Sequence, residues 1–342
     1  MKKYNKIIVI GPNSVHVENF IFLIKDLFDS IVVVSEEVTE FTYVNSSHVI
    51  SYRAKNPLTW LKENKKLEKI IVSEKPDFVH VQSINRQAFF ASIITKRLKI
   101  PLIATAWGSD VLVVPKRNIV FKKMVQRVLD RSAYISADSY EMIDAIHHLS
   151  KNKNVKYILL GINTIEIKPK EQIIYSNRLH KPLYNIDKII NAFHQFSSSN
   201  PDWKLVIGAV GPETENLKTQ VDQLNTNKIE FIGWLTQEEN IKQYQKAKIY
   251  ITIPSSDGTA VSLLEAMSAG CIPIVSDLTV SHEWIVDGEN GVILKPSEEN
   301  FFKRALSLDL EKVQQKNKEI ISKSGTKQIA TDSFQFVYKS VK

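Results

Sequence analysis

Short apolar runs that alternate with helix-patterned segments are the feature that most constrains this chain. In the first half, runs rich in Val and Ile fall at 6–10, 31–34, 77–81, 101–106, 133–137 and 155–160. Segments with apolar residues at helical spacing separate several of these runs, at 17–28, 58–73 and 86–98. Strands that alternate with helices predict βαβ units and parallel sheets, in which ligands bind at the carboxyl ends of the strands.

The alternation stops after Gly161, in the polar stretch 163–172, and then starts again. With 342 residues, the chain is too long for one ordinary core. We therefore predict an α/β fold with two Rossmann-like, doubly wound domains, over 1–165 and 166–325, that face each other across a cleft. We expect 326–342 to form a final helix that packs back toward the N-terminal domain.

Composition limits the compartment. The chain is 43% hydrophobic and 24% charged, as in soluble globular proteins. Its apolar runs are far shorter than the roughly 18 residues that cross a bilayer, and the start has only four consecutive apolar residues, too few for a secretion signal. Cys271 is the single cysteine, which excludes an internal disulfide and fits a reducing cytosol. We expect a cytoplasmic protein.

The net charge of +8 is concentrated in the first half. Residues 1–160 contain 24 Lys and Arg against 15 Asp and Glu, whereas the remaining 182 residues contain 21 against 22. This asymmetry favours a face that meets phosphates, of nucleic acid or of anionic lipid. A merely soluble basic surface is the alternative.

The segment 116–131 bears on that choice. Cations flank an apolar stripe there: Lys116, Arg117, Lys122, Lys123, Arg127 and Arg131 around Val120, Phe121, Met124, Val125, Val128 and Leu129. A basic amphipathic helix can lie on anionic lipid, or it can pack its apolar face on its own sheet. We favour a peripheral position on the cytoplasmic face of an inner membrane. No recognised motif supports nucleic acid as a partner.

The stretch "SSDGTAVSLLEAMSAGC", 255–271, joins a strand-like run to a helix-like run. A helix that starts near Thr259–Val261 offers free N–H groups and a positive dipole end to an anion, and Gly258 allows close approach. Asp257 and Glu265 could accept hydrogen bonds from hydroxyls on either side, which suits a nucleotide sugar. An ordinary capped helix is the alternative. A dehydrogenase is disfavoured because no GxGxxG follows any of the strands.

The motifs "PSSDGTAVSLLEAMSAGCIPIVSD" and "EWIVDGENGVIL" resemble the retaining family 4 glycosyltransferases of GT-B fold, of the type that assembles bacterial surface polysaccharide. The resemblance extends in order to "DFVHVQS", "TAWGSDVLV", "SNRLHKPLYNIDKIINAF" and "FIGWLTQEENIKQYQKAKIYI". It therefore covers nearly the whole chain.

The resemblance implies a role for each matching residue. Arg178 would hold the donor diphosphate, Asp257 would contact the transferred sugar and Glu265 the ribose. The other expected donor contacts are Gly11, Lys181, Gly233, Leu235, Gly258, Thr259, Ala260, Val261 and Ser262. The resemblance also implies a nucleotide sugar as substrate and a glycan or lipid-linked acceptor. We expect neither a cofactor nor a metal.

Three positions depart from the family pattern. The first acid is Asp257 where Glu is usual, Trp107 stands where His is common, and the usual Lys falls on Tyr184. Either His180 or Lys181 could take the place of that Lys. These departures motivate an alternative function, a non-catalytic sugar-nucleotide-binding scaffold in a polysaccharide-assembly complex.

In the first half, Asp110 follows the run 101–106 and is expected to orient the acceptor, so we count it with Arg178 and Asp257 as catalytic. A helix or turn cap is its alternative role. His16, His80 and Trp107 are the other candidate acceptor contacts, although a lone His is more often structural. No residue has the partnered base that a protein nucleophile requires. We therefore expect the leaving diphosphate itself to accept the acceptor's proton, with retention at the anomeric carbon.

Overall fold

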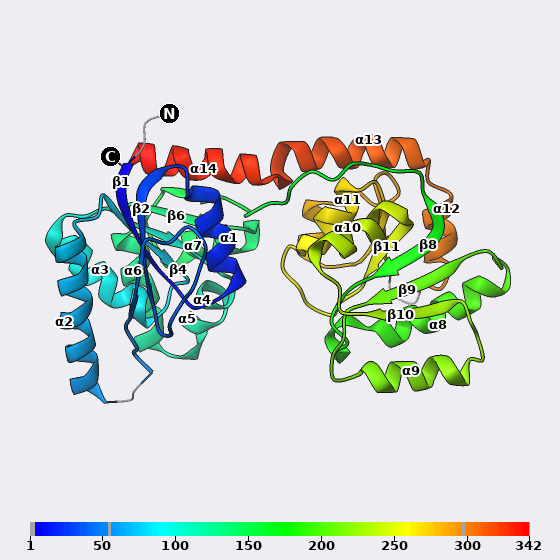
Figure 1. Cartoon of the computed structure of the whole chain (residues 1–342), viewed down its shortest axis with the longest axis horizontal. Coiled ribbons are helices and arrows are strands. Elements are labelled where there is room, and N and C mark those ends of the chain that lie inside the picture. The colour runs from blue at the N-terminus through cyan, green and yellow to red at the C-terminus, as the bar shows by residue number, and fades with distance from the viewer. Residues whose placement is uncertain (1–3, 54–55, 296–297, 342) are drawn as a thin grey trace. The chain divides into compact units, whose positions relative to one another are not determined.

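The computed structural model describes residues 4–53, 56–295 and 298–341. It divides into two compact units, Met1–Leu160 with Lys327–Lys342, and Gly161–Thr326. The described residues form one parallel sheet in each unit, with seven strands in the first and six in the second (Figure 1). The predicted fold class, two doubly wound α/β domains, is confirmed.

The first sheet has the strand order β3–β2–β1–β4–β5–β6–β7. Its strands are β1 (Tyr4–Ile10), β2 (Phe28–Ser35), β3 (Ser46–Val49), β4 (Phe78–Gln82), β5 (Leu102–Thr105), β6 (Tyr134–Ala137) and β7 (Val155–Tyr157). Six of them match the predicted apolar runs. The edge strand β3 was not predicted, because its sequence SSHV is short and mostly polar.

Helices cover both faces of this sheet. They are α1 (Val15–Ile24), α2 (Pro57–Glu74), α3 (Arg86–Leu98), α4 (Ser109–Leu112), α5 (Val114–Arg117), α6 (Ile119–Arg131), α7 (Tyr140–Leu149) and α14 (Lys327–Ser340). Because side chains alternate along a strand, Ile8 and Ile10 pack with α2, α3, α6 and α7, whereas Ile7 and Val9 pack with α1 and α14. The predicted helix 17–28 is too long at its end, since Phe28 already begins β2.

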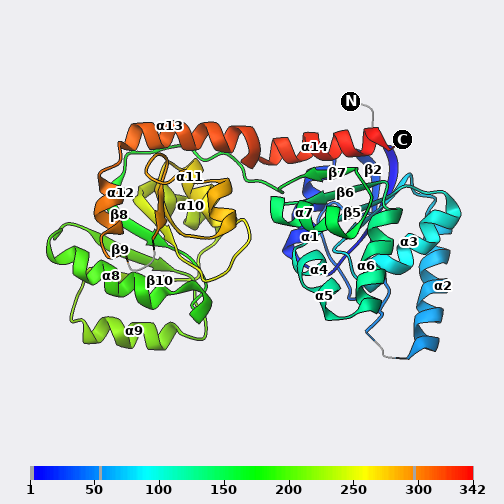
Figure 2. The same ribbon diagram turned by 180° about the vertical axis from the view of Figure 1, so that it is seen from behind.

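The last helix, α14, belongs to the first unit and packs beside α1 (Figures 1 and 2). Its buried face is Ala330, Phe334, Val337 and Tyr338. The Tyr338 hydroxyl lies 2.7 Å from Nδ1 of His80 in β4. Helix α14 therefore belongs to the same hydrophobic core as β1 and α1.

The second sheet has the strand order β10–β9–β8–β11–β12–β13. Its strands are β8 (Glu171–Ser176), β9 (Lys204–Gly208), β10 (Ile229–Gly233), β11 (Ala247–Thr252), β12 (Ile272–Ser276) and β13 (Val292–Leu294). The helical segments are η1 (Pro182–Tyr184), α8 (Ile186–Ser198), α9 (Thr214–Gln223), α10 (Gln237–Lys246), α11 (Val261–Ser268), η2 (Thr279–Glu283), α12 (Phe301–Leu306), α13 (Leu310–Ile320) and η3 (Ile321–Gly325).

Each sheet has one point at which the strand order reverses. It lies between β1 and β4 in the first sheet and between β8 and β11 in the second. The connections on either side of such a point lead away in opposite directions and leave a crevice at the carboxyl ends of the two strands, where ligands bind in open α/β sheets. The topology alone thus names two places in which to look for a site.

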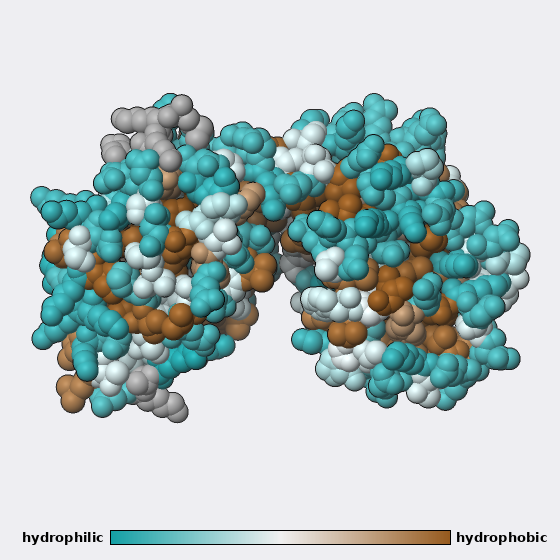
Figure 3. Space-filling view, in the orientation of Figure 1, coloured by the Kyte–Doolittle hydropathy of each residue, from teal (hydrophilic) through white to brown (hydrophobic). Residues whose placement is uncertain are grey.

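On the face drawn in Figure 3, hydrophilic side chains interrupt the apolar ones in both units. None of the helices in the described residues combines the length and the hydropathy needed to cross a lipid bilayer.

Candidate functional site

Two charged residues meet at the switch point of the second sheet. Arg178 follows β8 and Asp257 follows β11, and the two strands are neighbours. Arg178 Nη2 donates to Asp257 Oδ2 at 2.7 Å, and its Nη1 donates to Ser262 Oγ at 3.3 Å. The structure therefore brings together three of the residues that the sequence singled out, although 84 positions separate Arg178 from Ser262.

The helix that starts beside this pair, α11, has an uncapped N-terminus. It begins after Ala260 without a side-chain cap from any described residue, as do α8, α9 and α12 of the same unit. Among these four helices, α11 is the one whose first turn lies next to Arg178, through the contact of Ser262 with its guanidinium. The first N–H groups of α11 and its positive dipole end therefore point at the loop that holds Asp257, Gly258 and Thr259, an arrangement that binds anions.

Two buried hydroxyls lie at the same switch point. Ser176 ends β8 and Thr252 ends β11, and neither Oγ has a hydrogen-bond partner within the described part of the chain. A buried polar group without a partner is uncommon and indicates a place for water or ligand. Thr252 also lines a small pocket of about 20 Å³ with Asp257, Gly258 and Trp284.

A layer of tyrosine and asparagine side chains supports Arg178 and Ser262 from within the unit. The Tyr250 hydroxyl donates to Asn177 Oδ1 at 3.0 Å and lies 2.8 Å from Ser262 Oγ. Asn177 in turn donates to the Tyr244 hydroxyl at 2.7 Å. The sequence does not predict this layer, because its residues come from a loop, a helix and a strand that are far apart in the chain and share no pattern. Their one signal is that Asn177 directly precedes Arg178.

Burial and charge oppose each other at the central pair. Burial raises the pKa of Asp257, and Arg178 lowers it only in part, so the pKa stays above its ordinary value. Burial works against the charge of Arg178, but Tyr250, Asp257 and Tyr184 outweigh it and raise its pKa. The Tyr184 ring lies under the guanidinium, 4.5 Å from Cζ to the ring centre. Tyr184, which the resemblance places where Lys is usual, thus supports Arg178 with its aromatic ring.

Glu265 lies one turn inside α11. Burial raises the pKa values of Tyr175, Tyr244 and Tyr250, and the charge of Glu265 adds to the rise. Glu265 therefore faces the same tyrosine layer. A Cβ on Gly258 would meet nothing within 4 Å, so packing does not require glycine there. Thr259 Oγ1 accepts a hydrogen bond from Trp284 Nε1 at 3.4 Å.

Other predicted donor contacts lie apart from this group. His180 is buried, with its ring nitrogens 2.8 Å from Thr214 Oγ1 and 3.1 Å from the Gly208 carbonyl oxygen, so it is a structural residue. Lys181 is exposed and lines a separate pocket between α8 and α9. Gly233 ends β10, two strands from β8, and Leu235 follows it, where Trp234 is 70% exposed.

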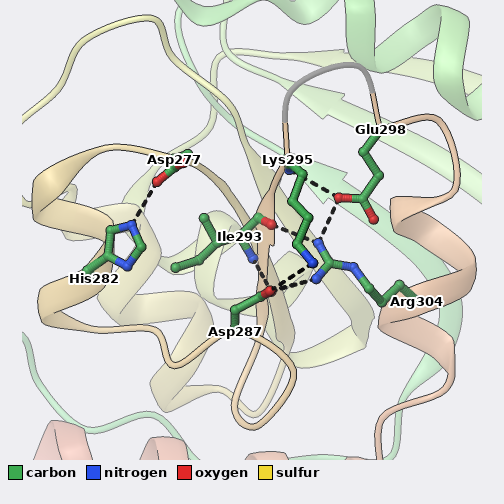
Figure 4. Close-up of polar contacts among 7 residues, drawn as sticks. All are labelled: Asp277, His282, Asp287, Ile293, Lys295, Glu298 and Arg304. Carbon is green, nitrogen blue, oxygen red and sulfur yellow. Dashed lines mark hydrogen bonds and ion pairs between the residues drawn. The ribbon is translucent and has the colours of Figure 1, made fainter.

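The second motif of the resemblance, 283–294, forms a braced turn (Figure 4). Asp287 accepts from the Ile293 N–H at 2.9 Å and from Arg304 Nη1 at 2.7 Å. Burial tends to raise the pKa of Asp287, but these two donors outweigh it and lower the pKa. Arg304 Nη2 also donates to Glu298 at 2.8 Å. Beside this turn, His282 lies 2.7 Å from Asp277. The motif thus fixes the loop after β12.

In the first unit, two of the predicted acceptor residues come together. His16 is exposed after β1, and its ring lies 5.6 Å from the ring of Trp107, which follows β5. Trp107 Nε1 donates to Gln82 at the end of β4. Gly11 has a packing reason of its own, since a Cβ there would approach Gln82 Cβ to 2.9 Å and Val17 to 3.0 Å.

The structure corrects the predicted role of His80. Its side chain is fully buried, and its ring nitrogens lie 2.7 Å from the Tyr338 hydroxyl and 2.8 Å from Thr105 Oγ1. Burial lowers its pKa to about 3, so the ring is neutral. An acceptor sugar cannot reach this position, and His80 instead links β4 to α14 and β5.

Asp110 is also buried, and its carboxylate accepts hydrogen bonds from the backbone N–H groups of Ile84 and Trp107. Burial raises the pKa of Asp110, and these bonds lower it in part. The carboxylate holds the loops after β4 and β5 together. Asp138, which directly follows β6, was not predicted. Burial, with a contribution from Asp110, raises its pKa to about 6.

Among the described residues, no three side chains of His, Cys, Asp or Glu gather where they could hold a metal ion. The expectation that no metal is needed rests on the sequence and stays a prediction.

Comparison with known proteins gives matches for both units. Residues 162–328 match the family model of glycosyl transferases group 1, and residues 6–139 match that of glycosyl transferase 4-like proteins. An uncharacterised glycosyltransferase of Methanocaldococcus jannaschii is 23% identical over 312 residues, which cover 87% of this chain and 84% of that protein.

Two solved structures share the fold. A glycosyltransferase from Rickettsia africae superposes with a TM-score of 0.79 at 16% identity, over 100% of this chain and 99% of the other. HepE of Anabaena, solved with UDP and glucose, superposes with a TM-score of 0.75 at 13% identity, over 98% of this chain and 100% of the other.

The fold and the family matches together define the class of protein, a glycosyltransferase of the GT-B fold. The two family matches span most of the chain and assign it to the family 4 type.

Proposed function

We propose that this enzyme transfers a sugar from a UDP-sugar to a hydroxyl of a glycan or of a polyprenyl-diphosphate-linked sugar. The observation that carries the proposal is the Arg178–Asp257 pair, 2.7 Å apart, at the switch point of the second sheet beside the start of α11. A guanidinium and helix N–H groups suit a diphosphate, and carboxylates suit sugar hydroxyls. UDP and a hexose or N-acetylhexosamine are favoured, since HepE was solved with UDP and glucose.

The proposed reaction retains the configuration of the anomeric carbon. The bond from that carbon to the diphosphate oxygen breaks, and the acceptor oxygen forms its bond on the same face. The acceptor's proton passes to the departing phosphate oxygen, so no protein nucleophile takes part. Arg178 and the N–H groups of α11 stabilise the charge on the diphosphate as it leaves, and they take the place that a divalent metal has in other transferases.

We place the enzyme in the assembly of a bacterial surface polysaccharide such as capsule or O-antigen, on the cytoplasmic face of the inner membrane. The stripe of 116–131 is only in part available for that role, because Val125, Val128 and Leu129 are buried in the first unit's core. The start of α6 is more open, with Ile119 and Val120 63% and 71% exposed. These two residues and the cations around them are the surface that we propose for lipid.

The donor site is tested by calorimetric titration of UDP, GDP, ADP and NAD into the wild type and Arg178→Ala. We expect one nucleoside diphosphate, UDP, to bind the wild type and to lose at least about tenfold in affinity in the variant, because a charge-assisted bidentate contact is removed. Lys312→Ala, on the exposed face of α13, is the control and should bind as the wild type does. Binding of NAD alone, or equal affinity in Arg178→Ala, would contradict the proposed site.

A transfer assay separates catalysis from the alternative of a non-catalytic scaffold, because both predict donor binding. Turnover of the matching UDP-sugar with acceptor, unchanged by EDTA, supports a metal-independent transferase. Binding without turnover supports the scaffold. NMR of the product gives the anomeric configuration, and an inverted product would overturn the proposed retention.

A further inference from the structure

A polar pocket of about 400 Å³ lies at the switch point of the first sheet. The loops after β1, β2 and β4 and the chain just after β3 form its wall, so it lies where four parallel strands present their carboxyl ends. This is the position that the topology itself marks for a ligand, by the same argument that marks Arg178 and Asp257 in the second sheet. All the lining residues belong to the first unit.

The charged side chains that line this pocket are two acids and two arginines. Glu36 and Glu37 lie opposite Arg53, with Arg53 Nε 2.8 Å from Glu36 Oε2 and Nη2 2.6 Å from Glu37 Oε1. Arg86 completes the set, and its guanidinium lies over the Trp60 ring at 4.3 Å. Two carboxylates and two guanidinium groups leave no net charge, and the carboxylates disfavour a phosphate.

The positions of these groups are set before any ligand arrives. Glu36 also accepts the Tyr52 N–H, and Arg86 donates to the Tyr52 carbonyl oxygen. The Asn85 side chain caps α3, which removes that helix start as an anion site. Each carboxylate retains lone pairs beyond its contact with Arg53, and these lone pairs can accept hydrogen bonds from hydroxyl donors.

We infer that this pocket binds an uncharged sugar through hydrogen bonds from its hydroxyls to Glu36 and Glu37. The volume suits one or two sugar rings, within the usual range of small-molecule sites. Asn13 lines the pocket from the loop after β1, and His16 lies just beyond that loop in the first turn of α1. The sugar is the terminal unit of the acceptor, and in this one respect the inference rests on the proposed function.

Saturation-transfer NMR on the full chain tests the inference, with the methyl α-glycosides of glucose, galactose, mannose and N-acetylglucosamine as probes. Glu37→Gln removes the charge of one acceptor, and Asn13→Trp fills the space. Glu40→Gln is the matched control, since it makes the same change three residues along, outside the pocket. We expect at least one glycoside to bind the wild type and the control, and to bind about tenfold more weakly to both pocket variants.

Three results would overturn the inference: no glycoside binds the wild type, the pocket variants bind as the wild type does, or the Glu40→Gln control loses the signal equally. UDP titration of the same proteins keeps the two proposals apart. If UDP fails to bind but the glycoside is lost in the pocket variants, the proposed donor site falls and the sugar pocket stands. If UDP binds equally to all variants, those variants are folded and the glycoside result concerns the pocket alone.

Discussion

At the scale of the residue, the two units differ in the partners of their candidate aspartates. In the second unit, Arg178 and Asp257 form a 2.7 Å ion pair at the uncapped start of α11. In the first unit, the Asp110 carboxylate accepts hydrogen bonds from two loop N–H groups, those of Ile84 and Trp107. We therefore expect the two aspartates to differ on substitution, since Asp257 belongs to the proposed donor site and Asp110 holds the loops after β4 and β5 together.

Asp138 gives the first unit a dependence on pH. Burial and the nearby Asp110 raise its pKa to about 6 from an ordinary 3.8, so the folded state holds this proton more tightly than the unfolded state does. The free energy of unfolding therefore falls as the pH rises from about 4 through 6, by at most about 3 kcal/mol for two pKa units.

Asp138→Asn cannot ionise and should lack this fall, so it should be more stable than the wild type at pH 7.5 but not at pH 4.5. Urea denaturation at the two pH values measures the difference. Asp144→Asn, on the exposed side of α7, is the control and should follow the wild type. A wild-type pH slope that persists in Asp138→Asn would show that the carboxyl is hydrated.

At the scale of the element, the last helix is the clearest case of a segment whose role the fold decides. Phe334 and Phe336 are two positions apart in α14, yet Phe334 is fully buried and Phe336 is half exposed. Phe334 packs against Phe20 of α1, at 5.0 Å between ring centres, and against His80. The helix therefore joins the core of the first unit through one face.

Phe334→Ala should lower the free energy of unfolding by about 3–5 kcal/mol, because it removes a buried aromatic ring and leaves a cavity. Phe336→Ala, on the same helix, should cost less than about 1 kcal/mol. Thermal or chemical denaturation followed by circular dichroism compares the two. Equal losses would mean that α14 does not pack on α1 and β4 in solution.

At the scale of the whole molecule, charge and exposed apolar residues coincide in one segment. Val113, Ile119 and Val120 are exposed, and no acidic residue occurs between Val113 and Leu129. Ion pairs within the described residues do not involve Lys122 or Lys123, so both charges are available to a partner. Exposed apolar side chains with lysines next to them in the sequence suit the surface of an anionic bilayer.

Vesicle co-sedimentation tests this surface. The wild type should bind vesicles that contain phosphatidylglycerol and not those of phosphatidylcholine alone. Lys122→Glu with Lys123→Glu should weaken binding at least about tenfold, since each cation near the surface contributes about 1 kcal/mol. Lys312→Glu with Lys318→Glu, on exposed positions of α13, makes the same change in net charge and should bind normally. Equal loss in both pairs would mean that overall charge, not this surface, attracts lipid.

Many of the strands and helices follow from local sequence patterns and could be predicted from the sequence. Six strands of the first sheet are contiguous apolar runs, and α3 covers the very residues, 86–98, that its spacing predicts. The stretch 255–271 likewise carries its own turn, helix start and acids. Local patterns of this kind follow from backbone periodicity and from the residues that begin and end helices, so they need no knowledge of distant contacts.

The tertiary structure alone decided which polar residues face a site and which are buried. His80 and His16 look alike in sequence, but one lies inside the sheet against Tyr338, 258 positions away, and the other is exposed. Glu36, Glu37 and Arg53 have no motif, and only the order of the strands brings them beside Arg86. The burial and the pairing of a side chain depend on contacts with residues that are distant in the sequence. Periodicity therefore predicts the strands and helices, whereas their packing determines which polar groups can take part in chemistry.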